Sequence, residues 1–285
     1  MISRFSSYRK EILLTLTILI SAFTILGWNL DINELKGDFH NFIPMSQSGA
    51  ICFASISLSL LIYLRLQSRF FHVIGYYLLG LVWMYAGLVL SRFILHFKFD
   101  PEGIFVVTSW MKGFIPKGRM SPVTALIFIL LISSFFVHIL HLNNTFQKIK
   151  KVTIIIIGIG CFLLITGYLY NTPLLYSENI IPVSFPAALL SFFLSLVLIN
   201  IYKIKLFSDK LKQQSFISWH LSKAFIPVVL VLVIVHGFIH ANIIYTSANP
   251  AVAAVLLLIV AIVITILIIN DLSKSIGNSI ELMEL

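Results

Sequence analysis

The chain has 285 residues, of which 59% are hydrophobic and only 11% charged, whereas an ordinary globular protein has about 25% charged residues. No water-soluble fold of this size buries that much apolar surface, so the composition excludes a soluble enzyme, a disordered chain and a secreted disulfide scaffold. The two cysteines, Cys52 and Cys161, fall in different predicted helices and indicate no disulfide framework.

Uncharged runs follow one another along the chain at 12–30, 39–64, 70–91, 120–147, 152–177, 179–202 and 224–270. Each is long enough to cross a bilayer, which takes about 20 apolar residues. The last run is long enough for two crossings, with Ala248-Asn249-Pro250 as the turn between them. The sequence therefore predicts an all-α integral membrane protein with eight transmembrane helices, the first of them a signal anchor rather than a cleaved peptide.

The basic residues predict the orientation of these spans. With the N-terminus inside, 14 of the 20 Lys and Arg residues fall in inner segments and five in outer ones, while Arg92 lies within a span. This positive-inside bias places both termini in the cytoplasm. The net charge of +9 then belongs to short inner loops facing anionic lipid, and no nucleic-acid partner is expected.

Related short sequence motifs, called words below, begin the even-numbered spans on the predicted outer side. In each of them a Ser is followed four residues later by Ala. The words are Met45 to Ala50, Met120 to Ala125 and Val183 to Ala188, with a fainter fourth version at 247–251. This repetition predicts a series of helical hairpins, each leaving the cytoplasm, looping and returning through a capped helix.

Two interpretations of these words remain open. Ser46, Ser121 and Ser184 are expected to cap helix N-termini, and the Ser-x-x-x-Ala spacing allows close helix packing. Alternatively, the capped N-termini converge near the outer surface and bind an anionic or carbonyl-bearing ligand. The candidate ligand or sensing residues are Ser46, Ser121, Thr124, Ser184, Arg92, His96, His236 and His240.

Arg92 lies one turn from the outer end of its span, where it is either a functional intramembrane charge or a side chain that snorkels to the interface. The histidines lie in an outer and an inner layer, as in a two-haem cytochrome, but polar packing or pH sensing fits them better. We expect no cofactor and no metal. Catalysis has little support, because acids other than Glu11 and Asp271 are expected in loops or tails.

Two further segments, a loop and the C-terminal end, have apolar patterns that predict their location or role. The loop 97–119 is expected to lie at the membrane interface with Trp110 at headgroup level. After Asp271, the stripe Leu272, Ile276, Ile280 and Met283 continues the last span as a signal-transmitting helix. The predicted domains are therefore an eight-span membrane domain, 1–271, and the start of a cytoplasmic signalling helix, 272–285.

Several words also resemble a known family. They are Leu26 to Ile32 through Met45-Ser46, then Lys117 to Leu126, then Gly167-Tyr168-Leu169-Tyr170 before Pro182 and Ala187-Ala188-Leu189. Together they resemble the N-terminal multi-pass membrane sensor region of bacterial PAS-containing histidine kinases, often hybrid kinases. The likeness runs over almost the whole chain, although Gln47-Ser48-Gly49 departs from the family's usual Pro/Lys-x-Thr pattern.

The resemblance implies a sensor domain of the bacterial inner membrane, homodimeric and embedded in lipid, that passes a cue to cytoplasmic PAS, kinase or cyclase modules or to a partner kinase. The chain itself is then not an enzyme. The rival hypothesis is a small-molecule transporter or a haem-b-binding membrane cytochrome.

Overall fold

The structure is a computed structural model that describes residues 2–38, 42–95, 100–103, 111–112, 115–116, 118–169 and 181–204. Within these ranges the chain forms seven helices and one short antiparallel ladder. The helices are α1 (Ile2–Asn29), α2 (Asn33–Lys36), α3 (Gln47–Arg65), α4 (Arg69–Leu95), α5 (Pro122–Ile139), α6 (Asn144–Leu169) and α7 (Phe185–Ile201). The ladder pairs β1 (Met111–Lys112) with β2 (Ile115–Pro116).

Five of these helices, α1, α3, α4, α5 and α6, are long and apolar enough to cross a membrane. The prediction of a helical protein built from membrane-length apolar segments is confirmed for them. The helix α7 is equally apolar but has 17 residues, because Ser184 caps it and Tyr202 ends it. The predicted run 224–270 and the stripe 272–283 lie outside the described residues.

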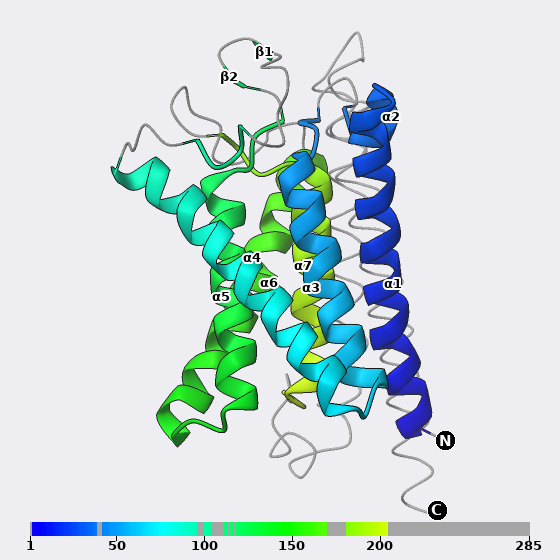
Figure 1. Cartoon of the computed structure of the whole chain (residues 1–285), viewed down its shortest axis with the longest axis vertical. Helices are drawn as coiled ribbons and strands as arrows, with labels where there is room; N and C mark the ends of the chain where they lie inside the picture. Colours follow the sequence, from blue (N-terminus) through cyan, green and yellow to red (C-terminus); the bar gives the residue numbers. More distant parts are fainter. Residues whose placement is uncertain are drawn as a thin grey trace, which may run out of the picture. The chain divides into compact units, whose positions relative to one another are not determined.

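The described helices belong to one compact unit. The helix α3 packs against α1 and α4, α4 packs against α5, and α7 contacts α1, α3 and α5. Figure 1 shows α1, α3 and α7 side by side, with α4 running diagonally across the bundle. Phe53 of α3 meets Phe128 of α5 edge-on in the core, with ring centroids 4.6 Å apart.

The outer faces of the helices are also apolar. Large side chains such as Phe70, Tyr77 and Ile94 on α4 and Ile156 on α6 are exposed. A water-soluble bundle keeps such side chains few and scattered, whereas hydrocarbon solvates them without cost. This exposure agrees with helices that face lipid.

One inner segment differs from the prediction. Lys150, expected in an inner loop, lies within α6 and is buried, with its ammonium 3.0 Å from Nδ1 of His138 and 4.6 Å from the centre of the Tyr202 ring. The uncharged run 120–147 contains the turn between α5 and α6, where His141 takes a positive φ of 48°. Hydropathy does not detect a turn whose residues are uncharged, so the run merged the end of one helix with the start of the next.

Candidate functional site

The three predicted capping serines are confirmed as N-caps. Ser46 Oγ accepts the amide N–H of Gly49 at 3.0 Å, and Ser121 and Ser184 do the same at the starts of α5 and α7. Each serine has an extended backbone, with φ between −66° and −63°. This is the conformation in which a short hydroxyl side chain reaches back to the first turn of its helix.

The alanines of the same words, Ala50, Ala125 and Ala188, are fully buried. One further turn into each helix, they belong to the continuous apolar core. A small side chain at this position allows the capped ends of neighbouring helices to approach closely. The packing interpretation of the Ser-x-x-x-Ala words therefore agrees with the structure.

The caps also meet one another. A single small cavity, about 10 Å³ in volume, is lined by four of the candidate residues, Ser46, Ser121, Thr124 and Ser184, and by Arg119. Residues from 43–45, 49, 120, 182 and 187 complete its wall. Such a volume accommodates about one water-sized atom. The convergence that the sequence left as one of two interpretations is thus present in the fold.

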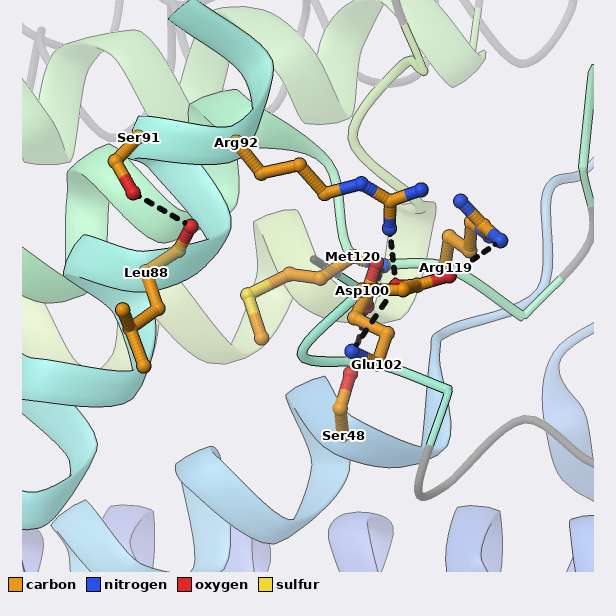
Figure 2. A network of polar contacts seen from close by, with 8 residues as sticks. All are labelled: Ser48, Leu88, Ser91, Arg92, Asp100, Glu102, Arg119 and Met120. Carbon is orange, nitrogen blue, oxygen red and sulfur yellow. Dashed lines mark hydrogen bonds and ion pairs between the residues drawn. The ribbon is translucent and has the colours of Figure 1, made fainter. Parts of the chain in front are cut away.

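A polar network from the loop before β1 adjoins this cavity (Figure 2). Glu102 is only 4% exposed. Its Oε1 accepts a hydrogen bond from the Ser48 hydroxyl at 3.0 Å and another from the amide N–H of Met120 at 2.6 Å. The Ser48 hydroxyl also lies 3.4 Å from Ser46 Oγ. Glu102 therefore joins the first turn of α3 to the residue that precedes the α5 cap.

Arg92 belongs to the same network. Its guanidinium forms an ion pair with Oδ1 of Asp100, whose Oδ2 accepts from Arg119 at 2.8 Å. Asp100 thus bridges the end of α4 and the segment that opens α5, as Figure 2 shows. All three side chains are about one quarter exposed, so the bridge lies at the rim of the site.

Burial dominates the ionisation of Glu102. Loss of hydration raises the pKa of this carboxyl above its ordinary value, the hydrogen bonds from Met120 and Ser48 and the charge of Arg119 partly oppose that rise, and Asp100 adds to it. A carboxyl in such surroundings takes up a proton more readily than an exposed one. The site therefore contains a carboxyl whose neutral form is favoured by its burial.

Sequence reasoning missed Glu102, which it placed with the other loop acids. Its partners lie 54 and 18 residues away along the chain, and one sequence does not reveal such a pairing. The available signal was local: Asp100-Pro101-Glu102-Gly103 has the composition of a turn, which the structure forms, but nothing in the sequence places this turn beside the first turn of α3.

Trp28 packs the end of α1 onto this region. Its indole N–H donates to the carbonyl of Met45 at 2.8 Å, and the ammonium of Lys36, itself paired with Asp31, lies 4.9 Å from the ring centre. Gly118 has a φ of 86°, and a Cβ there would be 2.9 Å from the indole. Only glycine combines this backbone conformation with so close an approach.

Tyr168 ties the end of α6 to the start of α7. Its hydroxyl donates to the carbonyl of Val183 at 2.6 Å. The Tyr168 ring meets Phe42 edge-on, and Phe42 stacks on Phe185 with centroids 5.0 Å apart. These contacts link the segment before α3 to the hairpin of α6 and α7, and so hold the third cap in place.

The remaining candidates are distributed as follows. His96, His236, His240, Trp110 and the stripe Leu272, Ile276, Ile280 and Met283 lie outside the described residues. Within the described ranges, no group of His, Cys, Asp and Glu is arranged to hold a metal ion. A wider groove of about 350 Å³ lies far from the caps, between the N-terminal part of α1 and the C-terminal end of α3. Apolar side chains and the Glu11–Arg65 ion pair are among the residues that line it.

Comparison of the chain with protein-family models, with curated proteins and with solved structures found no match.

Proposed function

We propose that the chain is the transmembrane signal-input domain of a bacterial receptor of the two-component type. It passes a membrane or extracytoplasmic cue to cytoplasmic PAS, kinase or cyclase modules, in cis or on a partner kinase. The chain performs no chemistry itself, lies in the cytoplasmic (inner) membrane as a multi-pass protein, and works as a homodimer.

The observation that carries this proposal is the meeting of the words that resemble sensor kinases. Trp28, Gly118 and Tyr168 come from separate quoted words, yet Trp28 contacts both Met45 and Gly118, and Tyr168 reaches the segment that opens α7. The resemblance therefore maps onto one structural element, the junction of the capped helices. A site that joins several hairpins is well placed to change their packing when its occupancy changes.

The finer topology belongs to the same proposal. Eight spans with both termini in the cytoplasm follow from the charge bias. The basic residues Arg65, Arg69 and Lys203 lie at the ends of α3, α4 and α7 that are opposite to the caps, which supports an arrangement with the caps outside.

The proposed mechanism is a small shift or rotation of the last helix when a cue favours one packing of the hairpins. To test it, the domain is joined through its C-terminal stripe to a kinase of the resembled family, and kinase activity is measured in membranes. One residue inserted after Ser273 turns a helix by about 100°, whereas seven residues make nearly two whole turns. The one-residue insertion should alter activity strongly, and the seven-residue insertion should largely preserve it.

Equal activity of both insertions and the parent would contradict transmission through the stripe. A purified domain with a Soret absorption band would instead favour the membrane cytochrome. The seven-residue insertion controls for linker length, because it lengthens the linker more than the single residue does and yet nearly preserves the helical phase.

A further inference from the structure

The groove between α1 and α3 is polar at the end of the bundle and apolar further in. Its lining residues are Tyr8, Glu11, Ile12, Thr15 and Leu16 of α1 and Leu61 and Arg65 of α3. Spacings of three and four residues place them on one face of each helix. The hydroxyl of Thr15 is satisfied within α1, because it donates to the carbonyl of Glu11 at 2.8 Å. The deeper wall is therefore formed by Ile12, Leu16 and Leu61.

The size of the groove fits part of a lipid molecule. From Tyr8 to Leu16 the helix α1 rises by about 12 Å, so the groove runs along the helix from its polar end into the apolar part. Its volume of about 350 Å³ lies in the range of small-molecule sites, which is about 300–1,000 Å³. It can hold a phosphate headgroup and the upper part of one acyl chain, while the rest of a phospholipid stays in the bilayer.

The ion pair at the polar end of the groove presents a cation to such a headgroup. Arg65 pairs with Glu11, but the Glu11 side chain is only 16% exposed, whereas that of Arg65 is 64% exposed. A guanidinium has five N–H donors in a fork that matches a phosphate group. One ion pair therefore leaves donors of Arg65 for the oxygen atoms of a phosphate.

The surrounding charges select a lipid with a net negative charge. Residues 8–11 and 65–69, which flank the polar end of the groove, contain four basic side chains and one acidic one. The α1 N-terminus and the turn between α3 and α4 lie together at the lower end of the bundle in Figure 1. Basic pockets between transmembrane helices at the cytoplasmic side attract anionic lipid, whereas a zwitterionic headgroup gains little from a surplus of cations.

We propose that this groove is a binding site for one anionic phospholipid. The lipid phosphate accepts hydrogen bonds from the Arg65 guanidinium, and one acyl chain lies along Ile12, Leu16 and Leu61. The inference rests on the proposed function, which places this end of the bundle in the cytoplasmic leaflet, and it names a lipid as the membrane cue. A lipid seated between α1 and α3 favours the packing of these two helices in which the groove is open.

The site is tested on the whole purified chain in mild detergent, titrated with phosphatidylglycerol, phosphatidylcholine or phosphatidylethanolamine. Native mass spectrometry measures the fraction of the chain that retains one lipid. A ligand that binds only the folded state also raises the melting temperature in a saturable way. We expect saturable binding of phosphatidylglycerol, binding of the two zwitterionic lipids that is roughly tenfold weaker, and no displacement by inorganic phosphate.

The variant Arg65→Gln removes the cation of the groove. It should weaken phosphatidylglycerol binding roughly tenfold, because hydrogen bonds between charged groups are among the stronger ones. The variant should fold, since an ion pair with an exposed partner contributes little to stability. Arg69→Gln is the matched control: it removes the same charge at the same end of the bundle, but Arg69 does not line the groove, so binding should change much less.

A second pair of variants tests the apolar wall. Ile12→Trp adds volume inside the groove and should abolish binding of the acyl chain without removing a charge. Leu19→Trp is its control, because Leu19 is also an exposed apolar residue of α1 but lies outside the groove. The Leu19 variant should bind phosphatidylglycerol as the parent does.

Equal binding of the three lipids to the unaltered chain would overturn the proposal, as would equal binding by the Arg65 and Arg69 variants. Displacement of the lipid by inorganic phosphate would contradict a lipid site and assign the groove to a soluble anion. If a variant fails to fold, the comparison of lipids on the unaltered chain still decides. Binding is measured without a kinase, so its failure is distinct from a failure of the proposed signalling.

Discussion

The most informative single residue is Glu102, a carboxylate that the fold buries at a junction of helices. An unpaired carboxylate in such a place costs several kcal/mol, and hydrogen bonds from Ser48 and Met120 offset part of this cost. Other ionisable groups near it are Asp100 and Arg119 in the same loop and Cys52 and Tyr85 on α3 and α4. The net effect on Glu102 is still a raised pKa.

A raised pKa makes the folded domain bind a proton that the unfolded chain releases. The stabilisation from Glu102 is therefore fully present below the ordinary pKa of 4.5 and is lost as the pH rises through the raised value. We expect the melting temperature of the domain in detergent to fall over this interval, and Glu102→Gln, which still accepts both hydrogen bonds, to flatten that dependence. The exposed acid Glu34 supplies the control substitution, Glu34→Gln, which should leave the dependence intact.

A second substitution separates charge from hydrogen bonding. Glu102→Ala leaves Ser48 and the Met120 amide without their acceptor and should lower stability by about 1–3 kcal/mol. If Glu102→Gln melts as the parent does at every pH, the carboxyl does not titrate in this interval, and the assignment of Glu102 as the responsive group is wrong.

Some contacts of the site could be predicted from the sequence, and others could not. The caps at Ser46, Ser121 and Ser184 were predictable, because each is a contact between a hydroxyl and an amide two or three residues away. The bonds of Glu102 and the bridge from Arg92 to Arg119 through Asp100 were not, because they depend on how separate hairpins are placed. The convergence of the caps belonged to one of two open interpretations, and the fold shows this convergence together with the buried alanines that the packing interpretation requires.

At the scale of elements, three of the described helices, α3, α5 and α7, begin at the same short word. Hydropathy predicted where apolar helices lie, but not their ends. The uncharged run 39–64 contains the extended segment before Ser46, so that α3 begins only at Gln47. Polar caps, rather than a change in apolar character, set where these helices begin.

The buried alanines provide the test at this scale. Ala125→Leu and Ala188→Leu add volume where the side chain is fully buried between helices, and overpacking of this kind costs about 1–3 kcal/mol. Thermal unfolding in detergent should show both variants melting below the parent. Ala22→Leu is the matched control, because Ala22 lies on the exposed face of α1; equal melting of all three variants would mean that the alanine seams tolerate larger side chains.

At the scale of the whole molecule, the proposed arrangement requires the two ends of the bundle to face different compartments. The caps, α2 and the β1–β2 ladder share one end (Figure 1). The turn between α3 and α4 carries Arg65 and Arg69 and lies at the other end. Positive-inside orientation then predicts a cytoplasmic location for the second end and an external location for the caps.

Reporter fusions test this orientation directly. We expect a cytoplasmic reading for reporters placed in the turns at Leu66 and Asn143, after Lys203 and after Leu285, and an external reading at Gly37 and Lys112. The physical reason is the cost of translocating short loops rich in Lys and Arg, which orients each hairpin in turn. Two reporters active on opposite sides of the membrane, fused at the same positions, control for expression and should give reciprocal signals. An external reading after Leu285 would leave an odd number of spans, and the eight-span arrangement with cytoplasmic output would have to be abandoned.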